Sequence, residues 1–213
     1  MNGYLSDVVA LTRKDLLVEL RSRDTVPAML LFVVGALVVF HFALPEDSSR
    51  LASAGMLWIA LLFTALLALV RSLVAESDEA VIDGLLLAPC DRSAIWLGKT
   101  LSVVAFLTLA ELVALPAFAL FYEPVTWELL AGVALANIGI AAVGTLLGAM
   151  AAAARARELL LPLLFMPLAI PLIVGGVGAT LADDPGSYLG FLALYDLIFA
   201  ILSWASFEYV VTE

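Results

Sequence analysis

Six long apolar stretches dominate this sequence and limit what it can fold into. Each has about 20 mostly apolar residues, the length at which an α-helix crosses the roughly 30 Å hydrocarbon core of a bilayer. They lie near residues 27–44, 51–70, 100–122, 129–154, 159–181 and 188–210. With 64% hydrophobic residues, the chain is too apolar for a soluble domain. We predict an all-α polytopic membrane protein, with residues 1–213 forming a single transmembrane domain.

Because the spans use most of the chain, we expect no separate soluble domain and no enzyme within it. Gly98-Lys99-Thr100 matches the end of a phosphate-binding loop, but Ser93 stands where that motif requires its first glycine, and no strand is predicted before it. We therefore predict no nucleotide site and no catalytic residue, and we place ATP hydrolysis on a separate subunit. Lys99 is predicted to be an interfacial anchor at the start of the third span.

The basic residues indicate the orientation of the spans. Nine of the ten Lys and Arg residues precede the first span or fall between spans two and three or spans four and five. Only Arg50 falls in a loop on the opposite side. By the positive-inside rule the nine are cytoplasmic, and an even number of spans puts both termini there. The first apolar stretch lacks a small-residue cleavage site, so we predict a retained span in a multi-pass protein of the cell membrane.

The net charge of −10 makes nucleic acid an unsuitable partner and would suit a high-salt cytoplasm in which repulsion is screened. Cys90 is the single cysteine, so no disulfide framework is expected.

Two amphipathic segments lie outside the predicted spans. Residues 3–24 resemble an interfacial helix, in which apolar and small residues recur at helical spacing. These are Leu5, Val9, Thr12, Leu16 and Leu20. Residues 76–88 place an apolar face, Val81 to Leu86, beside acidic residues; Pro89 ends this helix and Asp91 can cap the next one. The second helix either packs on the chain's own spans or docks into a partner.

The segment after the second span also carries a resemblance to a known family. It reads Arg71-Ser72, then Glu76, then Asp83-Gly84-Leu85-Leu86-Leu87-Ala88-Pro89, and then residues 91–99. It resembles the haem exporter protein B family (CcmB), the membrane subunit of the cytochrome c maturation ABC system. Similar pieces occur at Arg13-Lys14-Asp15-Leu16, Glu111 to Pro116, Leu161 to Leu172 and Tyr195-Asp196-Leu197.

This resemblance implies the six-span fold of ABC-2 type permeases, in which a cytoplasmic helix between spans two and three rests in a cleft of an ATPase subunit. The implied coupling residues are Glu76, Glu79, Val81, Ile82, Asp83, Gly84, Leu85 and Leu86. It further implies a cytoplasmic ABC ATPase and a haem-handling membrane protein as partners. Haem is then either the transported substrate or a ligand that the complex releases from a partner, and a homodimer is left open.

Two acidic residues, Glu111 and Asp196, fall well inside predicted spans, whereas Glu208 falls at the end of the last one. Glu111 lies near the middle of span three, where an ionised carboxylate costs about 3 kcal/mol or more, so it must face the bundle, be protonated or find a partner. It either serves a substrate path or conformational switch, or makes a structural hydrogen bond to a neighbouring span. Asp196 is expected nearer a membrane end, where it can reach water.

Haem binding would call for an axial ligand such as His, Met, Cys or Tyr. His41 is the only histidine and lies at the outer end of span one. Bis-His ligation within one chain is therefore excluded. His41 either faces headgroups or water, or contacts haem transiently.

Two of the predicted spans differ from the rest because they are rich in small or kink-forming residues. Span four carries Gly132, Ala136, Gly144, Gly148 and Ala152, a spacing that allows close helix contact within the chain or between subunits. Span five carries three prolines and a glycine cluster, so we expect it to be irregular and to face inward.

Three alternatives to haem-linked export remain at this point. The same fold could serve another substrate, such as a lipid or a drug, or the chain could be an assembly scaffold without transport. An intramembrane protease would need a histidine beside a serine or a cluster of metal ligands, and His41 lies near no such motif.

Overall fold

A computed structural model describes residues 2–22, 25–45, 49–71, 90–152 and 157–212. These residues are helical apart from short turns, with no strand among them. Their seven helices are α1 (Asn2–Ser22), α2 (Thr25–Ala43), α3 (Arg50–Leu69), α6 (Arg92–Phe121), α7 (Trp127–Ala152), α8 (Arg157–Leu181) and α9 (Pro185–Thr212). Six of them, α2 to α9, are long and apolar enough to cross a membrane. The predicted six-span, all-α membrane fold is confirmed.

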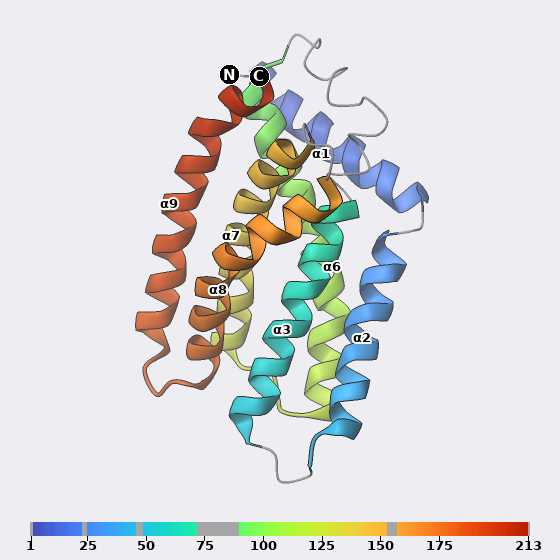
Figure 1. Cartoon of the computed structure of the whole chain (residues 1–213), viewed down its shortest axis with the longest axis vertical. Helices are drawn as coiled ribbons and strands as arrows, with labels where there is room; N and C mark the ends of the chain where they lie inside the picture. Colours follow the sequence, from blue (N-terminus) through green and yellow to red (C-terminus); the bar gives the residue numbers. More distant parts are fainter. Residues whose placement is uncertain (1, 23–24, 46–48, 72–89, 153–156, 213) are drawn as a thin grey trace.

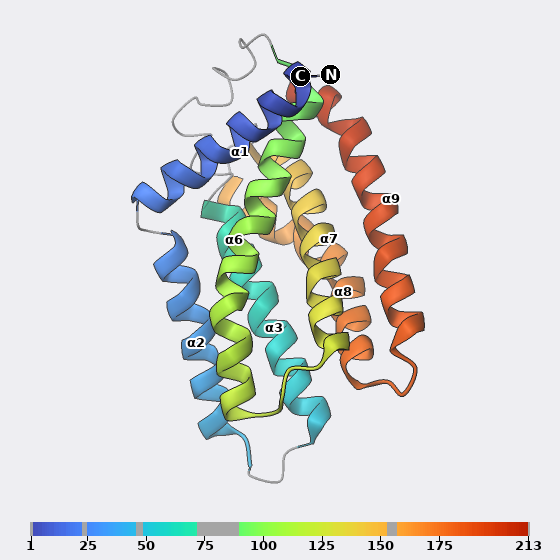
Figure 2. The same cartoon turned by 180° about the vertical axis from the view of Figure 1, so that it is seen from behind.

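The six spans run along the long axis of the molecule as one bundle, and α1 lies across one end of it (Figure 1). Both chain termini lie at that same end, which we call the termini end; the opposite end is the far end. Seen from behind, α1 crosses over the beginning of α6 before the chain enters α2 (Figure 2). The separate helix at residues 2–22 agrees with the amphipathic segment predicted over 3–24.

The core of the bundle is built around α7, the most buried of the six spans. Its glycines allow close contact with neighbouring helices. A Cβ atom at Gly144 would lie 2.5 Å from a methyl carbon of Leu69 on α3, and one at Gly132 would lie 3.6 Å from the Cβ of Ala179 on α8. Small residues in span four therefore serve packing within the chain at these positions.

The prediction that span five, which is α8, faces inward is wrong. Only about a third of the apolar part of α8 is buried within the chain. The helix stays continuous through Pro162, Pro167 and Pro171, and it changes direction partway along its length (Figure 1). Its glycines make close contacts with aromatic side chains: the Trp58 ring lies against Gly176, and the Tyr188 ring against Gly178.

The third span begins two turns earlier than the apolar stretch suggested, at Arg92 instead of near residue 100. Asp91 precedes the helix and accepts a hydrogen bond from the backbone N–H of Ser93 at 2.9 Å, which confirms the predicted cap. The hydrogen bonds from Ser93 lower the pKa of the Asp91 carboxyl because they favour its charged form. The added turns of α6 lie at the termini end, where α1 packs on them.

Candidate functional site

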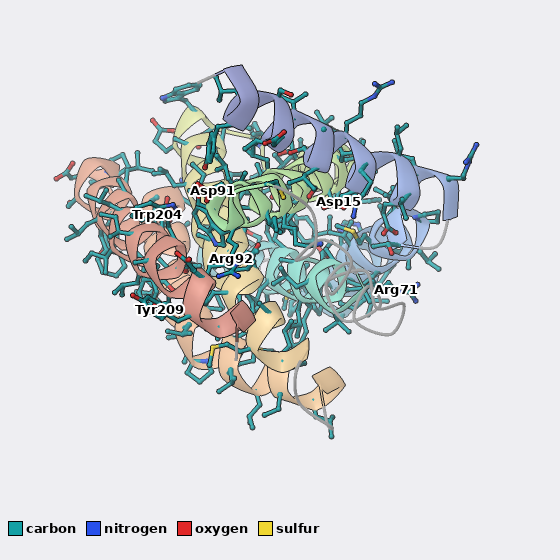
Figure 3. All side chains as sticks on the ribbon, turned by 90° about the horizontal axis from the view of Figure 1, so that it is seen from above. Asp15, Arg71, Asp91, Arg92, Trp204 and Tyr209 are labelled. Carbon is teal, nitrogen blue, oxygen red and sulfur yellow. The ribbon has the colours of Figure 1, made fainter. Side chains whose placement is uncertain are left out.

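A buried cluster of charged and polar groups joins α1 to α6 at the termini end. Asp15 of α1 is only 7% exposed, and it lies on the side of α1 that faces the bundle (Figure 3). One of its carboxylate oxygens lies 3.8 Å from Lys99 Nζ and accepts a hydrogen bond from Ser102 Oγ at 3.2 Å. The other oxygen lies 2.7 Å from Lys14 Nζ. The carboxylate therefore ties the surface helix to the third span.

The prediction that Lys99 is an anchor at the membrane surface is wrong, because Lys99 is only 6% exposed and lies beneath α1. The helices also meet through their backbones one residue earlier. A Cβ atom at Gly98 would lie 2.9 Å from Leu11 Cβ, and Thr12 donates a hydrogen bond to the Gly98 carbonyl at 3.2 Å. Because the helices touch this closely, α1 cannot shift along α6 without breaking the buried cluster.

The predicted apolar stripe of α1 is divided between two environments. Thr12 and Leu16 are partly buried against the bundle, whereas Leu5, Val9 and Leu20 are each more than half exposed. An exposed apolar face on a helix that crosses the end of a membrane bundle suits an interfacial position.

Glu111 makes its cross-helix contact in the middle of the bundle. Asn137 of α7 donates a hydrogen bond from Nδ2 to Glu111 Oε2 at 2.7 Å, and the two residues are 4% and 8% exposed. Glu111 thus faces the bundle and has a polar partner, as its place in the span requires. This partner was not identified from the sequence, although Asn137 is the only carboxamide side chain of the sequence besides Asn2.

The Glu111–Asn137 pair separates two spaces of different size. On one side a groove of about 440 Å³ runs between α6 and α7, with apolar walls that include Leu112, Leu115 and Val133. On the other side a cavity of about 20 Å³ lies inside the bundle beside Trp58. The pair is therefore the polar floor of a groove whose other lining residues are apolar apart from Thr108, an arrangement that can receive an amphipathic molecule.

Asp196 is not near a membrane end, contrary to prediction. It lies in the middle of α9, is 6% exposed, and neither carboxylate oxygen has a hydrogen-bond partner among the described residues. Asp196 is buried because α9 packs closely on α7: a Cβ atom at Gly139 would lie 2.5 Å from Asp196 Oδ1. The neighbouring Tyr195 hydroxyl donates to the Leu168 carbonyl at 2.7 Å, which holds α9 against α8.

His41 lies in the last turn of α2, at the far end of the bundle, and is exposed. The residues proposed to couple to an ATPase, Glu76, Glu79, Val81, Ile82, Asp83, Gly84, Leu85 and Leu86, lie outside the described residues. The described residues on either side, Arg71 and Asp91, are both at the termini end (Figure 3). Arg92, next to Asp91, forms a 3.4 Å ion pair with Glu208 and so joins α6 to α9 there.

We expect the Glu111–Asn137 hydrogen bond to contribute to the stability of the bundle. Glu111→Leu leaves the buried Asn137 carboxamide without its partner, so it should lower the free energy of unfolding by about 1–3 kcal/mol. Glu111→Gln keeps the shape and hydrogen-bonding capacity and should be tolerated. Membrane abundance and thermal unfolding of the purified chain in detergent measure both effects.

Two further variants make this test specific. Thr108→Val is the control for stability, because Thr108 also lines the groove but its hydroxyl donates to the Val104 carbonyl of its own helix at 2.8 Å, so the free energy of unfolding should change little. The double variant Glu111→Leu/Asn137→Leu should lose less stability than the sum of the single variants. A fully stable and active Glu111→Leu variant would show that the pair has neither a structural nor a functional role. If Glu111→Gln loses activity at normal abundance, the charge itself is needed.

Comparison with known proteins agrees with these features. The family described as CcmB protein matches residues 6–207, which include α2, α3, α6, α7 and α8 in full and most of α1 and α9. The chain is also 26% identical over 201 residues to the protein named Heme exporter protein B of Bradyrhizobium diazoefficiens. That alignment covers 90% of this chain and 88% of the relative. Because the family match extends over nearly the whole chain, the protein belongs to the CcmB family.

Proposed function

We propose that this chain is the permease subunit of an ABC transporter complex that serves haem export or cytochrome c maturation. The observation that carries the proposal is the family match over residues 6–207, on a fold of six candidate spans with a surface helix packed on the third. The relative's name, Heme exporter protein B, supplies the substrate class. Energy would come from ATP hydrolysed by a separate cytoplasmic subunit.

The termini end faces the cytoplasm in this proposal. Among the described residues, that end carries seven basic residues, and the far end carries only Arg50 among Lys and Arg. The seven are Arg13, Lys14, Arg21, Arg71, Arg92, Lys99 and Arg157. Basic residues are retained on the cytoplasmic side of membrane proteins, so the asymmetry favours this orientation.

The proposed route of coupling begins at the segment 76–88 and passes into α6. That segment precedes Asp91, the residue that caps α6, and it follows Arg71, which comes just after α3. An ATPase that moves the segment would pull on both spans. The Asp15 contact to Lys99 and the Arg92 contact to Glu208 would carry the motion of α6 to α1 and α9.

Within this proposal the complex either moves haem itself through the membrane or drives release of haem from a partner membrane protein. A permease for another amphipathic substrate is the second candidate function. The groove between α6 and α7 favours it, because a groove with apolar walls and the Glu111–Asn137 pair at its floor would accept many lipid-soluble molecules. Neighbouring genes for haem-handling proteins would favour the haem-linked function.

We predict that residues 71–99 and both termini are cytoplasmic. In a Cys90→Ser background, a cysteine placed at Ser48 should react with a membrane-impermeant thiol reagent added to intact cells, and one placed at Ser77 should react only after the membrane is opened. External labelling at Ser77, or protection at Ser48, would reverse the proposed orientation.

We also predict that the apolar face of residues 81–86 contacts the ATPase. An amphipathic helix outside the membrane needs cover for its apolar face. Leu85→Asp/Leu86→Asp should leave the permease at normal abundance in the membrane and abolish co-purification of the ATPase and its activity. The matched control is Ser72→Asp/Ser77→Asp, which adds the same charge nearby and keeps the apolar face. Unchanged co-purification in the leucine variant would show that the helix packs on its own spans.

A further inference from the structure

We infer that the far end of the bundle carries a haem-binding groove in which the His41 imidazole is the axial ligand of the iron. This inference rests on the proposed function for the identity of the ligand. The groove has a volume of about 430 Å³ and lies where the end of α2 meets the end of α6 and the start of α3. It is lined by His41, Phe42, Leu44, Pro45, Ser53, Phe121, Tyr122 and Glu123.

Aromatic rings surround the imidazole. The ring centre of His41 lies 5.1 Å from that of Phe121, 5.4 Å from that of Phe42 and 5.8 Å from that of Tyr122. The Tyr122 ring is perpendicular to the imidazole, at 90°. A flat apolar macrocycle bound at the imidazole would therefore meet ring faces and ring edges, the surfaces that pack well against another aromatic system.

Tyr122, which forms one wall of the groove, is held in place by residues outside the groove. The Tyr122 hydroxyl donates a hydrogen bond to the Leu37 carbonyl at 2.7 Å, and the Tyr122 ring stacks on Phe118 at 5.2 Å between ring centres. These contacts join α6 to α2 at the level of His41. The Tyr122 wall of the groove is therefore set in position before a ligand arrives, which lowers the entropy cost of binding.

The imidazole is available for coordination. His41 is exposed, and no described residue forms a hydrogen bond with its ring nitrogens. An unengaged nitrogen lone pair beside a groove is what a metal ligand requires, and histidine is a common axial ligand of haem iron. The aromatic neighbours contact the ring and leave its nitrogens unengaged.

The rim of the groove has charges of both signs. Arg50 Nε lies 2.6 Å from a carboxylate oxygen of Glu123, and the Arg50 side chain is 67% exposed. Haem carries two carboxylate groups at one edge of an apolar ring. The exposed guanidinium retains donors that can bind such a carboxylate while the ring lies against the aromatic wall.

The number of histidines in the chain predicts how the haem iron is coordinated. The chain has a single histidine, so this groove supplies one axial imidazole and leaves the second position of the iron open. A partner protein could supply a ligand at that open position and take the haem over. One imidazole at an open groove suits a site that passes its ligand on.

Haem titration of the full chain in lipid nanodiscs, in a Cys90→Ser background, tests this inference. Reduced haem should bind saturably, one per chain, with the absorption spectrum of five-coordinate histidine-ligated iron and an iron–histidine band in resonance Raman. His41→Ala should lose the saturable binding and this band. Haem that only partitions into the bilayer shows no iron–histidine band, and that result would overturn the inference.

A relocation variant separates the groove from a merely exposed imidazole. His41→Ala/Trp127→His moves the histidine to an exposed far-end position that does not line the groove, because Trp127 is 75% exposed. This variant should bind haem no better than His41→Ala. Equal binding by the relocated histidine, or an unchanged iron–histidine band in His41→Ala, would overturn the inference.

Cytochrome c formation in cells that lack their own CcmB subunit separates a failure of the haem groove from a failure of the proposed function. If the unaltered chain supports it but binds no haem through His41, the groove inference is wrong and the proposed function stands. If the chain binds haem at His41 but supports no cytochrome c formation, the site stands and the proposed function is wrong.

Discussion

Polar groups inside a bilayer have only protein partners, and this constraint organises the interior of the bundle. Glu111 is paired with Asn137 across α6 and α7 at 2.7 Å, and the Trp58 indole N–H donates to Thr180 across α3 and α8 at 3.1 Å. Tyr195 donates to a carbonyl of α8 at 2.7 Å. Each of these contacts joins two spans, so satisfying a polar group also fixes the relative position of two helices. Exceptions remain in the described part of the chain: Asp196 is buried against Gly139 without a hydrogen-bond partner, and the Trp96 indole N–H and the Ser203 hydroxyl are also buried without one.

The same constraint explains the junction between α1 and α6. An isolated buried charge is costly, and removing one member of a buried ion pair destabilises a protein by about 3–5 kcal/mol. Asp15 and Lys99 are both nearly inaccessible, so each depends on the other and on Ser102. The surface helix is thereby held to the third span by charge as well as by apolar packing. A force applied at the start of α6 would reach α1 through this cluster, which suits the coupling role proposed for this end.

Local pattern predicted the elements well and their contacts poorly. The six spans, the surface helix and the Asp91 cap follow from apolar length, helical spacing and residue type, which are properties of neighbouring residues. The partner of Glu111 lies 26 residues away, and Asp15 meets Ser102 from 87 residues away. Periodicity indicates which face of a helix is apolar but not which helix will cover it. Lys99 and Asp196 were both placed near water for this reason, because the helices that bury them could not be identified from sequence.

The central claim is that this chain converts ATP hydrolysis by a partner into delivery of haem for cytochrome c. The most direct measurement is covalently attached haem on a c-type cytochrome, in cells deleted for their own CcmB subunit and supplied with this chain and its ATPase. The account predicts that haem attachment returns, and that it is lost again when the ATPase is replaced by a variant that binds ATP but cannot hydrolyse it. Haem attachment that persists with the inactive ATPase would contradict the claim, as would its absence when both proteins are intact and abundant in the membrane.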